Sequence, residues 1–244
     1  MSIRIRPLRL EGFEQLPNHA RQCVFWEVDP QTLAHGDQLA DPEFEKEAWL
    51  SMVMLEWGSC GQVATAEAED AADDDDDDDE RCRGFVLYAP PRAVPRAQRF
   101  PTGPVSADAV LLTSMGVEVG DNRTDDAEGV KALLIGQVVN ELVRRGVRAL
   151  EAFGRTPAAV EALASDTVDP DLAPVVEALG DCSFDQCMID ADFLANAGFT
   201  VVAPHPYFPR LRLELDKGLG WKAEVEAALE RLLESAQLQE VTLR

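Results

Sequence analysis

The chain has 244 residues, 46% of them hydrophobic, so it can bury a sizeable core in one large domain or two small ones. Its 45 acidic and 22 basic side chains give a formal charge of −23. A surface this acidic repels nucleic acid and anionic lipid, so we expect neither nucleic acid nor a membrane as a partner.

The cysteines and the N-terminus indicate the compartment. Five cysteines without CxxC spacing are typical of reduced, mostly buried thiols rather than of a disulfide framework or a zinc site. The first residues alternate polar and apolar side chains, and no apolar run approaches the length of a bilayer span. We therefore expect a cytoplasmic protein without a bound metal.

The N-terminal third predicts an edge strand at residues 2–10, a short helix within 11–20, a longer helix from Asp41 to Gly58, and a hairpin of residues 60–65 and 82–89. An N-cap Asp followed by Pro favours the helix start at Asp41. We interpret the apolar side chains of this helix as core-facing rather than as a surface for stacking a cofactor: Phe44, Trp49, Met52, Val53 and Trp57.

The acidic segment 67–80 lies between the two hairpin strands and includes seven consecutive Asp residues. Like charges repel and almost no apolar area is available, so we predict a disordered hairpin tip. A solvated loop is favoured over a site for divalent cations or a basic partner, because the run lacks the glycine and the spacing of a calcium loop. Deleting residues 67–80 should leave the fold intact, and a large fall in melting temperature would contradict this interpretation.

A proline-rich connection follows at residues 89–105 and predicts a stiff, extended segment. Its three arginines, Arg92, Arg96 and Arg99, either meet an anionic ligand or balance the acidic surface, and the sequence leaves both readings open.

The central stretch, residues 108–154, predicts a strand, a loop, a helix and a second strand, which together form a βαβ unit. Arg144, Arg145 and Gly146 mark the end of the helix. Its apolar stripe is expected to pack on the sheet: Val130, Leu133, Leu134, Val138 and Leu142.

The C-terminal third predicts helices and two strands. We expect helices starting at Thr156–Pro157 and at Asp169–Pro170, a helix over 187–199 that ends at Gly198, strands at 200–203 and 207–215, and an amphipathic C-terminal helix at 221–236. No internal repeat is present, so residues 1–244 are interpreted as a single domain.

This order of elements resembles the GNAT superfamily of acetyl-CoA-dependent N-acyltransferases. LLTSMGVE is similar to the fourth strand of that fold, DAEGVKALL lies where the family has a (Q/R)xxGx(G/A) pyrophosphate signature, and FLANAGFTVV is similar to its FYxxxGF helix end. CVFWE and the proline-rich connection also resemble an actinobacterial subgroup labelled as acetyltransferases. The resemblance implies an α/β (mixed α+β) fold, whose central mixed, mostly antiparallel, splayed sheet is flanked by helices.

The resemblance also implies a site. Acetyl-CoA would be the co-substrate, held by backbone at Met115, Gly116 and Val117 and, at the phosphate turn, by Gly129, Val130 and Lys131. The expected activity is transfer of an acetyl group to a small-molecule or peptide amine by direct attack. Glu118, at the end of the fourth strand, is the candidate general base, directly or through water, and the alternative is an ordinary strand-end acid. A homodimer is left open.

The phosphate signature is degenerate. Asp126 occupies the Q/R position, Lys131 replaces the closing small residue, and Leu194 stands where a Tyr often serves as general acid. A helix N-terminus favours an anion by about 0.3 to 1 kcal/mol, whereas one like charge at contact costs about 1 kcal/mol in water. The alternative function is therefore a catalytically degenerate GNAT-fold binding protein with weak or no acetyl-CoA binding.

Three further side chains are of types that can take part in catalysis. Glu27 is expected at a solvated rim rather than in the acceptor cleft, and His205, between two prolines, is expected to be structural rather than catalytic. Cys23 is a remote candidate for a nucleophile, because the sequence assigns no base beside it.

Overall fold

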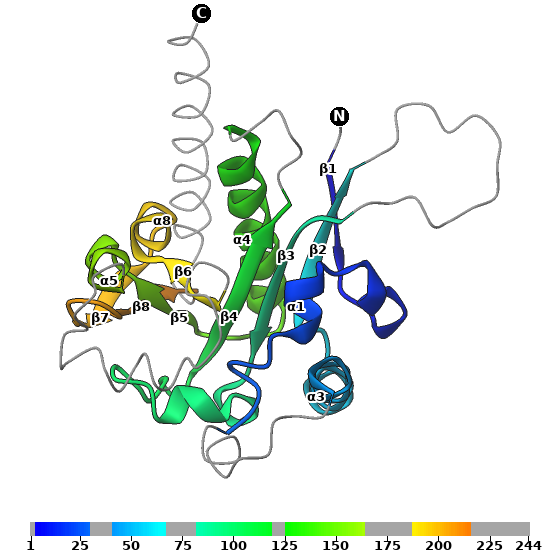
Figure 1. Ribbon diagram of the computed structural model, residues 1–244, viewed down its shortest axis with the longest axis horizontal. Coiled ribbons are helices and arrows are strands. Elements are labelled where there is room, and N and C mark those ends of the chain that lie inside the picture. The colour runs from blue at the N-terminus through cyan, green and yellow to red at the C-terminus, as the bar shows by residue number, and fades with distance from the viewer. Residues whose placement is uncertain (1–2, 30–40, 67–81, 119–124, 164–186, 216–244) are drawn as a thin grey trace, which may run out of the picture.

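The computed structural model describes residues 3–29, 41–66, 82–118, 125–163 and 187–215 (Figure 1). Its strands are β1 (Ile3–Pro7), β2 (Gly61–Ala66), β3 (Cys82–Ala89), β4 (Ala109–Val117), β5 (Ala149–Arg155), β6 (Ile189–Asp190), β7 (Thr200–Ala203) and β8 (Arg210–Glu214). Its α-helices are α1 (Asn18–Gln22), α3 (Pro42–Trp57), α4 (Asp125–Arg144), α5 (Pro157–Leu163) and α8 (Ala191–Asn196), and its 3-10 helices are η1 (Leu10–Gln15), η2 (Pro91–Ala93) and η3 (Pro95–Gln98).

Three predicted segments lie outside the described residues: the acidic tip at 67–80, the helix expected from Asp169, and the C-terminal helix at 221–236. Among the helices that the structure describes, none has the length and apolarity needed to cross a bilayer.

One mixed sheet organises the chain. Its strand order is β1-β2-β3-β4-β5-β8-β7, with β6 added to β5. The β4–β5 and β5–β6 pairs are parallel, and the other described pairs are antiparallel. The prediction of a mixed, mostly antiparallel sheet flanked by helices is confirmed, and so are the edge strand, the hairpin and the βαβ unit.

β4 and β5 pair only in their first halves and then diverge (Figure 1). The last pair between them joins Leu112 to Ala152, although both strands continue beyond it. A register shift between β3 and β4 leaves Thr113 without a partner in β3, and its hydroxyl donates to Leu87 O at 3.1 Å. Such a bulge bends and twists a strand. The bulge therefore lies where the sheet opens, and the predicted splay is present.

α4 packs on one face of the sheet, and α1 and α3 pack on the other (Figure 1). The prediction that the α4 stripe is buried is confirmed except at Leu133, which is exposed. Ile135 and Val139 are buried as well, because the face of α4 that contacts the sheet is wider than the predicted stripe.

α3 begins as predicted, with the Asp41 side chain accepting a hydrogen bond from Phe44 N at 3.0 Å. Trp49 and Val53 are buried as predicted, but Phe44 and Met52 are exposed. The buried arc instead includes Lys46 and Leu50, so the helix is rotated relative to the predicted apolar face.

The helix predicted over residues 187–199 is wrong in its first part. Residues 189–190 form β6, and the helix α8 starts only at Ala191. Asp190 accepts from Asp192 N at 2.9 Å and from Phe193 N at 3.0 Å, which makes it the N-cap of α8. Gly198 has a φ of 95° and ends this segment as predicted.

The proline-rich connection forms η2 and η3 rather than one extended segment. Arg96 is buried, donates to Phe25 O, and places its guanidinium carbon 4.2 Å from the centre of the Phe25 ring. Burial lowers the pKa of Arg96 to about 10. Arg99 Nη2 lies 3.4 Å from Asp29 Oδ2. Through these contacts, Arg96 and Arg99 hold the segment that follows α1 against the proline-rich connection.

Candidate functional site

The edge of β4 beyond its pairing with β5 forms the first part of the site. Glu118 N donates to Arg83 O of β3 at 2.9 Å. Backbone groups alternate sides along a strand, so the N–H and C=O groups of Met115 and Val117 point away from β3, into the gap between β4 and β5. Among the described strands, none pairs with β4 on this side beyond Leu112. The edge can therefore accept an extended ligand.

Gly116 has a different role from its two neighbours. It is paired with Phe85 of β3, so its backbone groups face away from the gap. A Cβ at Gly116 would lie 2.6 Å from Phe85 Cε1, which means that glycine is needed for the ring to cover the strand. Of the three backbone contacts predicted in β4, Met115 and Val117 face the gap and Gly116 does not.

β6 occupies the opposite side of the gap. Gly154 N donates to Pro209 O at 2.9 Å, on the β8 side of β5, so the backbone groups of Arg155 face toward β4. The parallel pairing of β6 with Gly154 and Arg155 uses that side. A ligand in the gap would thus lie between the β4 edge and β6. The sequence did not predict β6, because a two-residue strand has no periodicity to detect.

The start of α4 lies at the same end of the sheet. α4 has 20 residues, and the N–H groups of its first turn favour anions. Lys131 Nζ lies 5.7 Å from the centre of the Phe193 ring of α8, and Gly129 is partly exposed. Val130 is buried, with its Cγ1 3.1 Å from the position of a Cβ at Gly84, so its side chain anchors the helix rather than contacting a ligand.

Glu118 is exposed at the end of β4. Side chains alternate faces along a strand, so Glu118 lies on the face of Ser114 and Gly116, the face covered by α1 and α3. Four residues of strand separate Glu118 from Ser114 by about 13 Å. The predicted base is therefore at the open end of the gap and outside the cavity described next.

A small cavity of about 10 Å³ lies on the α1 and α3 face, next to the start of the gap. This volume is about that of one water molecule. Its walls come from the segment around α1, from α3, β3 and β4, and from the segment just before β6: His19, Ala20, Cys23, Trp26, Glu27, Lys46, Phe85, Ser114 and Cys187.

A buried ion pair forms one wall of the cavity. Lys46 Nζ contacts the Glu27 carboxylate, and each side chain is 2% exposed. Lys46 Nζ also donates to Cys23 O at 3.0 Å, and Trp26 N donates to Glu27 Oε2 at 3.1 Å. The expected rim position of Glu27 is therefore wrong. Its charge is tolerated inside the protein because Lys46 neutralises it and both groups are hydrogen-bonded.

Two cysteines and a histidine form another wall. Cys23 Sγ lies 3.6 Å from Cys187 Sγ, and His19 Nε2 lies 3.9 Å from the same Cys187 sulfur. Cys187 is disulfide-bonded. The expectation of reduced thiols is therefore wrong for Cys187, and it stands for Cys23, Cys60 and Cys82, which form no disulfide.

Burial makes the thiols of Cys23, Cys60 and Cys82 poor nucleophiles. It raises the pKa of Cys23, an effect that the charge of Glu27 strengthens, and it raises the pKa of Cys60 to about 12 and of Cys82 to about 11. His205 is structural as expected, since its Nδ1 accepts from Tyr207 N at 3.1 Å and from Phe208 N at 3.0 Å.

Sequence reasoning missed Lys46, His19 and Cys187 as residues of the site. Lys46 had a signal, because Trp49, Leu50 and Val53 follow it at i+3, i+4 and i+7 and place it on the buried arc of α3. His19 and Cys187 are 168 positions apart, and no local pattern links them.

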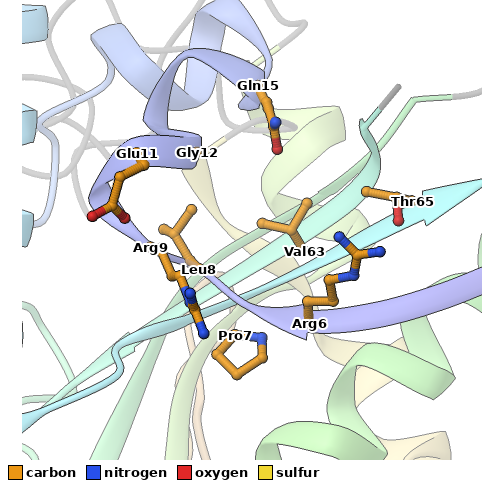
Figure 2. A pocket seen from close by; sticks show the side chains of 9 residues that line it. All are labelled: Arg6, Pro7, Leu8, Arg9, Glu11, Gly12, Gln15, Val63 and Thr65. Atoms are coloured by element: carbon orange, nitrogen blue, oxygen red, sulfur yellow. The ribbon is translucent and has the colours of Figure 1, made fainter. Parts of the chain in front are cut away.

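A larger pocket of about 580 Å³ lies elsewhere, at the β1 edge of the sheet (Figure 2). Its walls carry both signs of charge, from Arg6 and Arg9 and from Glu11 (Figure 2). It is lined by Arg6, Pro7, Leu8, Arg9, Glu11, Gly12, Gln15, Val63 and Thr65. It contains none of the residues predicted for a site, and we assign the candidate site to the β4 edge and the cavity beside it.

No family model matches the chain, and no curated protein matches it. Several solved structures are similar in fold. An N-acetyltransferase from Staphylococcus aureus Mu50 has 12% identity and a TM-score of 0.44, over 88% of this chain and 100% of that one. The ribosomal-protein-S18-alanine N-acetyltransferase from Escherichia coli has 12% identity and a TM-score of 0.40, over 89% and 99%.

The protein yncA from Salmonella typhimurium, solved with its cofactor acetyl-CoA, has 13% identity and a TM-score of 0.42, over 89% of this chain and 96% of that one. Similarities at this level concern the fold and transfer no residue role and no activity to this chain.

Proposed function

We propose that this protein is a GNAT-type N-acyltransferase that moves an acetyl group from acetyl-CoA to the amine of a small molecule or a peptide. The observation that supports this most is the divergence of β4 and β5 after Leu112, which turns the backbone N–H groups of Met115 and Val117 toward a gap beside the start of α4.

The residues around this gap fit the chemistry of acetyl-CoA. Its pantetheine arm is extended and has two amides, so it can bond the β4 edge as an added strand does. The first turn of α4 and Lys131 suit the pyrophosphate, whereas the exposed Glu128 opposes it. Because β6 covers the edge of β5, the arm would hydrogen-bond to β4 alone.

Acetyl-CoA supplies the activated thioester, and the remaining roles belong to this chain. The Val117 N–H is the proposed donor to the carbonyl oxygen, where negative charge develops during attack. Glu118 is the proposed base for the ammonium proton, directly or through water. Glu27 is a weaker candidate, because its two oxygens already accept hydrogen bonds from Lys46 Nζ and Trp26 N.

The proposal predicts saturable binding of acetyl-CoA with a micromolar dissociation constant in isothermal titration calorimetry. The titration should be run with acetyl-CoA and with free CoA, each at low and moderate salt, since the acidic surface repels an anionic ligand less when salt screens it. Binding followed by acetyl transfer in a screen of amines would support the enzyme. No heat at millimolar acetyl-CoA would instead favour the degenerate binding protein.

A pair of variants tests the β4 edge itself. Val117→Pro deletes the N–H that faces the gap, at a position where the bonds to β3 come from the flanking residues. We expect acetyl-CoA to bind about tenfold more weakly, the equivalent of one hydrogen bond. Val117→Ala keeps the N–H and is expected to bind like the wild type. Equal affinity for all three proteins would exclude this edge as the binding surface.

Gly129 provides a test at the other end of the ligand. Gly129→Trp places a large side chain in the first turns of α4, where the pyrophosphate is expected, and should abolish acetyl-CoA binding in the same titration. The Gly12→Ala variant changes a glycine in η1 and should bind normally. A Gly129→Trp protein that binds as the wild type does would contradict the assignment of the phosphate turn.

A further inference from the structure

The cluster of His19, Cys23 and Cys187 has no role in the proposed acyl transfer. The three side chains lie in the cavity wall, and their nitrogen and sulfur atoms are all within 4.8 Å of one another. We propose that, when the Cys187 disulfide is reduced, these residues form a Cys₂His site for a soft or borderline transition metal such as Zn²⁺. This inference does not depend on acetyl-CoA binding.

The spacing of the three atoms fits a tetrahedral metal ion. With Zn–S bonds of about 2.3 Å and Zn–N bonds of about 2.0 Å, a tetrahedral centre separates two sulfurs by about 3.8 Å and a sulfur from a nitrogen by about 3.5 Å. The observed separations are 3.6 Å between Cys23 and Cys187 and 3.9 Å between Cys187 and His19. The third separation, between Cys23 Sγ and the His19 nitrogen, is at most 4.8 Å, so a side-chain movement of up to about 1 Å would complete the geometry.

The surrounding structure holds the ligands in place. His19 and Cys23 are four residues apart on one helical turn, where Cys23 N donates to His19 O at 2.8 Å. Lys46 Nζ donates a hydrogen bond to the carbonyl of Cys23 at 3.0 Å, and Trp26 Nε1 donates one to the carbonyl of Cys187 at 3.0 Å. The adjacent cavity has room for about one water molecule, which can fill the fourth position.

Charge balance also favours a divalent ion. Two thiolates without a cation would be unfavourable in this site, because burial penalises a charged group. Zn²⁺ bound to two thiolates and a neutral imidazole gives a site of zero net charge. The neighbouring Glu27 and Lys46 already neutralise each other. Binding should therefore release one proton from each cysteine to solvent.

Cys187 makes the site depend on redox state. Its sulfur can be part of the disulfide or a metal ligand, and it cannot be both at once. A dithiol reductant passes two electrons and two protons to the disulfide, so that the S–S bond breaks, both cysteines become thiols and the reductant becomes a cyclic disulfide. Reduction should therefore create the site, and oxidation should release the metal.

The test is a titration of the full-length protein with Co²⁺, which binds in zinc sites and has an optical spectrum. In a trialkylphosphine reductant, which offers no thiolate of its own, one equivalent of Co²⁺ should produce thiolate-to-cobalt charge-transfer absorption in the near ultraviolet. Zn²⁺ should then displace it. The oxidised protein should show no such band. Its absence from the reduced protein, or an equal band in the oxidised protein, would overturn the proposal.

Variants identify the ligands. Cys23→Ser and Cys187→Ser should each weaken Zn²⁺ binding by more than about 100-fold. A loss of about 100-fold is the upper limit expected when only a hydrogen-bond partner of a metal ligand is removed, so the loss of a ligand itself should be larger. Cys82→Ser, in which a buried cysteine of β3 is replaced, is the matched control and should keep the band. Circular dichroism checks that each variant folds. A band that survives in Cys23→Ser would contradict the assignment.

Adventitious binding by carboxylates has its own signature. Deleting residues 67–80 removes the acidic run, whose oxygen ligands suit hard cations and give no thiolate absorption. The deletion variant should keep the charge-transfer band and its one-to-one stoichiometry. Loss of Co²⁺ binding in this variant would show that the acidic run holds the metal, and the Cys₂His assignment would be wrong.

Discussion

Replacing Lys46 with methionine is expected to destabilise the protein by about 3 to 5 kcal/mol, the usual effect of removing one partner of a buried ion pair. Lys46 and Glu27 are each 2% exposed, so the variant leaves a carboxylate in the interior without its counter-ion. Urea denaturation followed by circular dichroism measures the loss.

The double variant Glu27→Gln/Lys46→Met separates charge from packing. Glutamine can still accept the hydrogen bond from Trp26 N, and neither side chain of the former ion pair carries a charge. We expect this protein to be more stable than Lys46→Met alone, although it has one more substitution. A double variant that is less stable than the single one would mean that the ion pair itself, and not the unpaired charge, determines the effect.

Local signals predicted the elements, because each one depends on residues close together in the chain. The N-cap at Asp41 and the apolar period of α4 are sufficient to locate two helices. The errors within these elements have a common cause. Phe44 and Leu133 are apolar and lie near the predicted stripes, but the direction in which a helix faces is set by the sheet it packs on, which a helical period does not contain.

The candidate site was predictable only where backbone forms it. Met115 and Val117 face the gap because a strand alternates, and a strand can be recognised from sequence. β6 depends on a return of the chain to the edge of β5, and the contact of Cys23 with Cys187 joins residues 164 positions apart. Neither leaves a local pattern. The reduced state predicted for Cys187 failed for the same reason.

Replacing Glu151 with alanine should also destabilise the protein by about 3 to 5 kcal/mol. Its side chain is 0% exposed, while those of Arg210 and Arg212 are 14% exposed. Glu151 Oε2 accepts from Arg210 Nη1 at 2.5 Å and Oε1 accepts from Arg212 Nη1 at 3.0 Å, so the variant leaves two partly buried guanidinium groups without this carboxylate. The network holds β8 against β5. It thereby also helps to hold β5 in place, the strand from which β4 diverges.

Acid should reveal the same network in the wild type. Burial acts to raise the pKa of Glu151, but hydrogen bonds from Ser106 and the two arginines outweigh it, so the pKa is lowered in the folded state. A lowered pKa gives stability that is complete above the pKa of the unfolded chain, about 4.3, and is lost as the pH falls through the folded-state value. Thermal melts from neutral pH downward should show this loss.

Glu151→Gln isolates the titration, because its amide keeps the size of the side chain and has no charge to lose. Its melting temperature should be lower at neutral pH and should fall less steeply below about pH 4 than that of the wild type. Glu56→Gln is the control, since Glu56 and Arg92 are 61% and 65% exposed and lie 3.9 Å apart. It should shift stability by less than about 1 kcal/mol. Parallel acid profiles for the wild type and Glu151→Gln would show that other carboxylates determine the acid stability of this fold.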